Sequence, residues 1–274
     1  MGLQAAKNKA VIFLHIPRVG GTTLKTIMRR QYDRRFVYEG VHNALPEFKG
    51  LDESARAKIQ VLEGHMPFGL HAFLPQPATY VTLLREPVDR VISIYYYVLR
   101  SPRHYAHAQV SAQQIDLETF VSGEIAKGVD NGQTRLISGV GSTPDFDGCS
   151  RETLELAKKN LREHFSVIGL TKKFDETLIL LKRTLGWGLP FYTRKNITRE
   201  RPYRSNPPQA LVKLIRQRNK WDVELYEYAQ ERMEEQLRGQ PAAFVRDLER
   251  FRTLNRLYTP LGRLEARLRR GTPS

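Results

Sequence analysis

Apolar positions along the chain fall into two patterns, short continuous runs and stripes that repeat every three or four residues. Continuous runs occur at 11–14, 79–84 and 167–170, and they have the length of buried strands. The stripes predict amphipathic helices between and after these strands. The predicted helices begin near Thr22 and cover 53–61, 88–99, 117–123, 153–165, 174–185, 210–237 and a segment around 248–257. Strands that alternate with helices predict an α/β fold, in which helices flank a central parallel sheet in three layers.

The composition changes after the longest predicted helix, 210–237. Residues 239–274 are rich in arginine and carry apolar residues at helical spacing between Leu248 and Leu257. We therefore expect an α/β domain over 1–238 and a helical C-terminal extension over 239–274. The helix of the extension could pack on a second copy of the chain, which would make the protein a homo-oligomer.

The stretch 10–32 combines a predicted strand, a glycine-containing loop and a helix N-terminus. This order gathers free backbone N–H groups at the positive end of a helix, which is where anions bind. The residues suited to a phosphate or sulfate group are Gly20, Gly21, Thr22 and Thr23. The loop is P-loop-like but differs from the nucleotide-triphosphate motif, because Arg18 precedes the glycines and no lysine precedes Thr22. A strand-turn-helix without a ligand is the alternative interpretation.

A second unit of the same kind follows the strand at 79–84. Arg85 comes directly after that strand, and Pro87 suits the first turn of the next helix. In open α/β sheets, ligands bind at the carboxyl ends of the strands, so Arg85 is a candidate anion ligand. The alternative is a surface ion pair with Glu86 or Asp89.

The single cysteine, Cys149, excludes an internal disulfide and a cysteine-based zinc site, and it suits a reducing compartment. No apolar run approaches the length of a membrane span, and residues 1–10 lack the apolar core of a secretory signal. We therefore expect a cytoplasmic protein without a transmembrane segment. His104 and His107 lack a third ligand nearby in the sequence, so no metal site is expected.

The net charge of +15 indicates an anionic partner. Nucleic acid, acidic polysaccharide, anionic lipid and a highly charged cofactor all remain open on charge alone. No zinc-finger spacing, RNA-recognition signature or helix-turn-helix pattern is evident, so a dedicated nucleic-acid motif is not expected.

Two motifs of the chain, and the order in which they occur, resemble those of the PAPS-dependent carbohydrate sulfotransferases. They are HIPRVGGTTL at 15–24 and LLREPVDRVISIYYY at 83–97. The branch that the chain resembles most contains the uronyl 2-O-sulfotransferases and their bacterial relatives. GHMPFGLH at 64–71 and DNGQTR at 130–135 are also similar to that branch, and the likeness covers residues 9–228.

The resemblance implies transfer of the sulfuryl group from PAPS to a hydroxyl acceptor, a sugar or an acidic polysaccharide, with PAP as product. Gly20, Gly21, Thr22 and Thr23 would hold the 5′-phosphosulfate. Arg85 and Ser93 match the family's pair for the 3′-phosphate, and His65 aligns with its general base. An imidazole can act as a base near neutral pH, and no metal is required for this chemistry.

Arg18 departs from the family pattern, which usually has lysine at this position. That lysine stabilises the leaving oxygen. Arginine keeps the charge but differs in geometry and is not a ready proton donor. Three interpretations follow: Arg18 serves with altered geometry, another cation has taken over, or the protein binds PAPS-like ligands with weak or no transferase activity.

Four further residues are candidates for binding the acceptor: His71, Asn131, Gln133 and Arg135. The last three could instead organise the sheet edge. Two other functions remain to be weighed. The basic surface could grip nucleic acid or another polyanion beside a vestigial loop, or the chain could be a kinase with an unusual phosphate loop.

Overall fold

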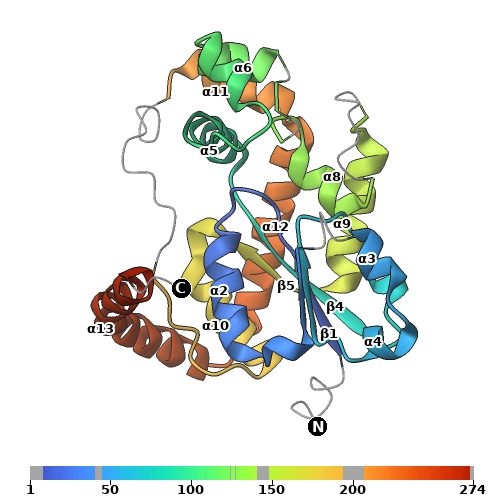
Figure 1. The fold of residues 1–274 in the computed structure, drawn as a ribbon, viewed down its shortest axis with the longest axis vertical. Coiled ribbons are helices and arrows are strands. Elements are labelled where there is room, and N and C mark those ends of the chain that lie inside the picture. The colour runs from blue at the N-terminus through green and yellow to red at the C-terminus, as the bar shows by residue number, and fades with distance from the viewer. Residues whose placement is uncertain are drawn as a thin grey trace.

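The computed structural model describes residues 9–40, 45–123, 125–126, 128–140, 148–193 and 207–271, the last twelve as backbone only. Five parallel strands form one sheet in the order β2-β3-β1-β4-β5 (Figure 1). The strands are β1 (Ala10–Leu14), β2 (Val37–Glu39), β3 (Val61–Gly64), β4 (Ala78–Leu84) and β5 (Phe165–Leu170). The predicted α/β class with a parallel sheet is confirmed.

β1 is the central strand, and its register decides where the loops meet. Leu14 at its end pairs with Gly64 of β3 on one side and with Thr82 of β4 on the other. The residues that follow these three strands therefore emerge at the same edge of the sheet. The chain leaves β1 toward β2 on one side and later returns to β4 on the other, which opens a crevice at this point.

Helices cover both faces of the sheet. The α-helices are α2 (Gly21–Gln31), α3 (Leu45–Gly50), α4 (Glu53–Ala57), α5 (Pro87–Arg100), α6 (His107–Ala112), α7 (Leu117–Ser122), α8 (Gly132–Ser138), α9 (Arg151–His164), α10 (Phe174–Leu185), α11 (Gln209–Arg218), α12 (Lys220–Arg238) and α13 (Ala243–Gly271). Short 3-10 turns are η2 (Arg34–Phe36), η3 (Leu70–Phe73) and η4 (Thr171–Lys173). α2 and α10 lie on one side of the sheet, and α3 and α9 lie on the other (Figure 1). Every residue of β1 is buried, as expected for a central strand between two helical layers.

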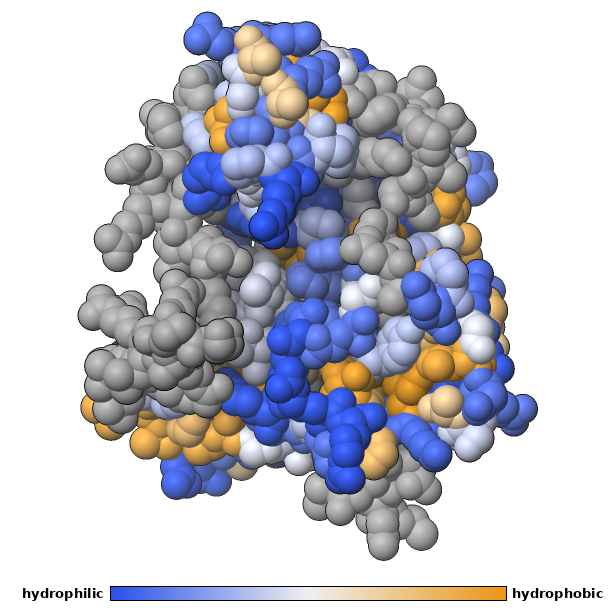
Figure 2. Space-filling view, viewed as in Figure 1, coloured by the Kyte–Doolittle hydropathy of each residue, from blue (hydrophilic) through white to orange (hydrophobic). Residues whose placement is uncertain are grey.

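A second apolar cluster lies beyond the carboxyl edge of the sheet. It is formed by α5, α6, α7 and α11, which group together at the top of Figure 1. Val91, Phe120 and Ile215 are fully buried in it. On the face drawn in Figure 2, hydrophilic side chains gather between this helical group and the body that holds the sheet. The candidate site lies at this junction, because Arg85 is at the carboxyl end of β4, directly before the start of α5.

The structure corrects the predicted elements at two places. The helix expected at 53–61 ends at Ala57 and gives way to β3, whose four residues include the charged but buried Glu63. β2, β3 and α3 were not predicted, because they are too short to show a periodicity. The single helix expected over 210–237 is divided at Asn219, whose side-chain amide donates to the carbonyls of Val129 and Ile215.

The longest helix is α13, within the predicted extension. Its residues Phe244, Leu248 and Phe251 are buried in the same core as the sheet. The domain boundary at residue 238 stays a prediction, as does association through this helix. In the described part of the chain, no helix is both long and apolar enough to cross a membrane.

Candidate active site

The turn after β1 has the backbone geometry of an anion-binding loop. Arg18 and Gly20 both adopt left-handed conformations, with φ values of 71° and 92°. Such values are uncommon for a residue with a Cβ and concentrate at functional sites. Gly20 is the N-cap of α2, and its position leaves the helix without a side-chain cap. The Thr23 N–H donates to the Gly20 carbonyl, so the N–H groups of the first turn of α2 that face an anion are those of Gly21 and Thr22.

Thr22 and Thr23 lie inside this first turn, directly after Gly21. Thr22 is exposed and Thr23 is buried. No acidic side chain lies in the first turn of α2. A negative ligand at this point meets the positive end of the helix without a competing carboxylate.

His15, the residue that follows β1, packs its ring against the loop at Gly21. Its ring is buried and lies between Phe13 and His65, with ring centroids 5.0 Å and 4.3 Å apart. A Cβ on Gly21 would lie 2.0 Å from this ring, so only glycine leaves it room. Burial, followed by the nearby His65 and Lys25, lowers the pKa of His15 from 6.5 to about 3. The His15 imidazole is therefore neutral at physiological pH.

His65 is exposed at the end of β3, and its ring orientation is fixed by the backbone. Its Nδ1 lies 2.6 Å from the carbonyl oxygen of His15. A carbonyl only accepts, so Nδ1 carries the proton and donates. In the neutral ring this leaves the lone pair on Nε2, which is the form that can take a proton from a hydroxyl.

Arg85 joins the second loop to the first. Its NH1 donates to the carbonyl oxygen of Arg18 at 2.8 Å, and its Nε pairs with Asp89 at 2.7 Å. The ion pair that the sequence offered as an alternative is thus present, and the same guanidinium also contacts the first loop. The side chain is 13% exposed. The Arg85 guanidinium therefore provides a positive charge at the carboxyl end of β4, beside the turn in which Arg18 has a positive φ.

Arg18 extends toward α5. Its Nε donates to the hydroxyl of Ser93 at 3.2 Å, and its guanidinium lies over the ring of Tyr97, 4.6 Å from the centroid. Ser93 is fully buried. The structure therefore brings together Arg18, Arg85 and Ser93, which the sequence placed in one phosphate-binding region.

Three residues at this edge were missed by sequence reasoning. Lys25 of α2 forms an ion pair with the buried Glu63, two residues before His65 in the chain. The Thr171 hydroxyl lies 2.6 Å from the carbonyl oxygen of Val19, in the first loop. Glu63 lies near the end of β3, and Thr171 directly follows β5. Both positions are at this edge of the sheet, and recognising where the strands end would have indicated them.

The candidates for acceptor binding are placed differently. Asn131, Gln133 and Arg135 are buried, and their side chains bond within the chain. Gln133 holds the backbone of Arg85, and Arg135 pairs with Asp130 at 2.5 Å. The structure favours the alternative in which these residues organise the sheet edge, and contact with an acceptor stays a prediction.

His71 is not brought to the other candidates. Its Nδ1 lies 3.0 Å from the hydroxyl of Tyr80, and its ring lies against His164, which directly precedes β5. Tyr80 and Phe165 pair at the start of their strands. His71 is therefore near the amino ends of the strands. Arg85 follows β4 five residues after Tyr80, a separation of roughly 16 Å along the strand direction.

A family model described as galactose-3-O-sulfotransferase matches residues 5–261. The chain belongs to this family of sulfotransferases. The match confirms the resemblance seen in the motifs, although the branch named by the motifs was that of the uronyl 2-O-sulfotransferases. It also continues past Tyr228 into the arginine-rich segment, further than the motifs indicated.

Three kinds of carbohydrate sulfotransferase are similar to this chain. Galactose-3-O-sulfotransferase 3 of Mus musculus is 25% identical over 244 residues, covering 81% of this chain and 56% of the relative. Heparan sulfate 2-O-sulfotransferase 1 of Gallus gallus is 28% identical over 248 residues, covering 84% and 64%. Heparan-sulfate 6-O-sulfotransferase 2 of Danio rerio is 29% identical over 220 residues, covering 69% and 44%. The chain thus spans about half to two thirds of the length of these relatives.

The donor of this family, PAPS, carries a phosphosulfate and a separate 3′-phosphate, and the site offers a place for each. The uncapped N-terminus of α2 and the exposed Gly20 suit the first group, since a Cβ at Gly20 would meet nothing within 4 Å. The Arg85 guanidinium suits the second, because it brings a positive charge to the carboxyl end of β4. Ser93 is fully buried and accepts from Arg18, so its contact with the 3′-phosphate stays a prediction. The residues present therefore fit the donor.

Proposed function

We propose that this chain transfers the sulfuryl group of PAPS to a hydroxyl of a sugar. The observation that carries the proposal is the meeting of three features at one sheet edge: an uncapped helix N-terminus, a cationic second loop and a histidine with a fixed tautomer. The names of the relatives, which refer to galactose and heparan sulfate, support a carbohydrate acceptor.

His65 is proposed as the general base. Its Nδ1–H is held by the His15 carbonyl, so Nε2 can accept the proton of the acceptor hydroxyl as its oxygen attacks sulfur. PAPS supplies the activated sulfuryl group, and PAP leaves. A positioned base contributes about 10²–10⁴ in rate.

The first loop is proposed to stabilise the charge that develops on the phosphosulfate. The N–H groups of Gly21 and Thr22 point from the helix N-terminus, and Arg18 adds a cation on the same turn. Of the three interpretations of Arg18, we favour the one in which Arg18 itself stabilises the leaving oxygen with altered geometry. Its support is that the Arg18 side chain reaches from the first loop to Ser93 and Tyr97 of α5. We also propose a cytoplasmic location, which rests on the single cysteine.

Donor recognition is tested by calorimetric titration with PAP and with 5′-AMP, which lacks the 3′-phosphate, at two salt concentrations. We expect wild type to prefer PAP and Arg85→Ala to lose that preference. Arg162→Ala is the matched control, because it removes the same charge from an exposed position of α9. A preference that persists in Arg85→Ala contradicts the assignment of the 3′-phosphate.

Binding of a polyanion is the second candidate function, and the net charge of +15 favours it. It predicts an affinity for nucleic acid that falls steeply with salt and does not depend on Arg85. Titration of wild type and Arg85→Ala with a nucleic acid, at the same two salt concentrations, therefore separates the two functions.

A further inference from the structure

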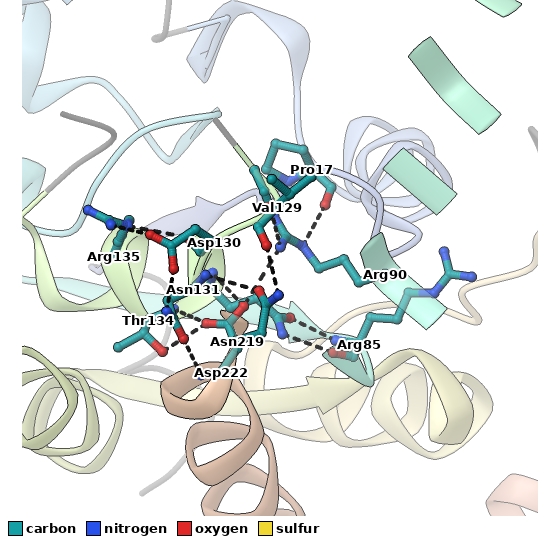
Figure 3. Close-up of polar contacts among 12 residues, drawn as sticks. Pro17, Arg85, Arg90, Val129, Asp130, Asn131, Thr134, Arg135, Asn219 and Asp222 are labelled. Atoms are coloured by element: carbon teal, nitrogen blue, oxygen red, sulfur yellow. Dashed lines mark hydrogen bonds and ion pairs between the residues drawn. The ribbon is translucent and has the colours of Figure 1, made fainter. Parts of the chain in front are cut away.

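A group of buried polar side chains lies beneath the two loops and takes no part in the proposed transfer. It consists of Arg90, Asn131, Gln133, Thr134, Asn219 and Asp222, and we call it the buried polar cluster (Figure 3). Each of these residues is at most 5% exposed. Burying so many polar groups is unfavourable unless they satisfy one another, so the arrangement requires an explanation.

Two helices in the cluster cap each other. The carboxylate of Asp222 accepts from the backbone N–H groups of Gln133 and Thr134, at 3.1 Å and 2.7 Å, in the first turn of α8. The side-chain oxygen of Asn131 accepts from the N–H groups of Trp221 and Asp222, at 2.9 Å and 3.1 Å, in the first turn of α12. The first-turn N–H groups of each helix, which have no partner within that helix, are thereby bonded by a side chain from the start of the other helix. The two helix ends are fixed relative to each other.

Gln133 connects this joint to the second loop. Its Oε1 accepts from the N–H of Arg85 at 2.9 Å, and its Nε2 donates to the carbonyl oxygen of Arg85 at 2.9 Å. One amide side chain therefore holds both polar groups of the Arg85 backbone. The direction in which the Arg85 side chain leaves the chain follows from this clamp.

Arg90 connects the same joint to the first loop. Its Nε donates to the carbonyl oxygen of Pro17 at 3.2 Å, and its NH1 lies 3.7 Å from a carboxylate oxygen of Asp222. Its NH1 also donates to the carbonyl oxygen of Gly128 at 2.9 Å. Gly132 leaves space for this guanidinium, since a Cβ there would lie 2.9 Å from NH2. Both loops are thus tied to one buried support.

We propose that Gln133 and Arg90 are positioning residues for the donor site. Gln133 orients Arg85 for the 3′-phosphate, and Arg90 holds the first loop for the 5′-phosphosulfate. Neither residue is exposed enough to touch the donor, so each acts through the backbone it holds. The inference rests on the proposed function, because it concerns the same site.

The two residues predict different binding defects. Gln133→Met keeps the length of the side chain and removes both of its hydrogen bonds to Arg85. We expect the affinity for PAP to fall by about tenfold, which corresponds to about 1.4 kcal/mol, and the affinity for 5′-AMP to stay at the wild-type value. Arg90→Lys keeps a buried cation but loses the forked contacts. We expect it to weaken PAP and 5′-AMP by the same factor.

The matched control is Asn160→Leu. Asn160 is also a buried amide, and it donates to the backbone carbonyls of Ile137 and Ser138, at the far end of α8. This variant should lower the unfolding temperature and leave the PAP to 5′-AMP affinity ratio unchanged. Where Gln133→Met fails to fold, Gln133→Asn makes the same test, because it keeps a neutral amide but is one methylene too short to hold both backbone groups of Arg85.

A wild-type affinity ratio in the folded Gln133 variant overturns the proposal. A fall of that ratio in Asn160→Leu also overturns it, because loosening of the fold would then explain both results. A wild-type protein that does not prefer PAP over 5′-AMP contradicts the proposed function itself. That outcome is seen before any variant is measured, so the two failures are distinguishable.

Discussion

The contact between Gly21 and His15 gives a sharp prediction for Gly21→Ala. The added Cβ would lie 2.0 Å from Cδ2 and Nε2 of His15, whereas ordinary contacts begin at 3.4 Å. The ring must therefore move by more than 1 Å. It is 7% exposed and lies between Phe13 and His65, so it can move only by displacing them.

We expect Gly21→Ala to lower the free energy of unfolding by about 1–3 kcal/mol, the usual cost of overpacking. The displaced ring also pushes His65, and a misplacement of about 1 Å at a reacting group can cost about 10²-fold in rate. Urea unfolding measures the first effect. Single-turnover transfer at saturating PAPS measures the second.

Two variants isolate the cause. In His15→Ala/Gly21→Ala the clash is absent, so the double variant should be more stable than the sum of the two single effects predicts. Gly20→Ala costs about 1–2 kcal/mol through its left-handed φ of 92° but meets no atom within 4 Å, so it should spare the position of His65. Additive effects in the double variant would refute the steric explanation.

Three further predictions follow from the described contacts. The pKa of His15 is lowered from 6.5 to about 3, so below pH 6.5 the unfolded chain binds a proton that the folded chain refuses. The free energy of unfolding should therefore fall as pH falls from 6.5 to 3, by up to about 5 kcal/mol, and His15→Phe should flatten this slope in urea titrations across pH. Asn131→Ala removes the cap of α12 and should lower stability by about 1–2 kcal/mol in chemical unfolding, against no change if the cap is dispensable. His71→Ala should retain wild-type turnover, because His71 lies near the amino ends of the strands; a loss of turnover would show that it reaches the acceptor.

The two loops were predictable because their signals are local. The strand at 79–84 and the apolar run at 11–14 each lead directly into the residues that matter, Arg85 and Arg18. A glycine pair between a strand and a helix is typical of an anion-binding turn. Local signals were sufficient for this part of the site.

The support of the loops could not be predicted, because it joins distant parts of the chain. Asn131 and Gln133 were recognised as polar residues of interest, yet their function depends on Asn219 and Asp222, about ninety positions later. Arg90 lies within the apolar stripe of α5 and gave no signal of its carbonyl partners. β3 was missed because it is short and because Glu63, whose partner Lys25 lies on α2, interrupts its apolar run.

The most direct test of the central claim is sulfate transfer by wild type and His65→Ala, followed by mass spectrometry. The assay supplies PAPS with methyl β-galactoside or an unsulfated heparan-type oligosaccharide. The account predicts that wild type forms a sulfated sugar and PAP in equal amounts, and that His65→Ala binds PAP normally but forms neither product. Turnover that persists in His65→Ala, or PAP binding by wild type with no sulfation of either sugar, would contradict it.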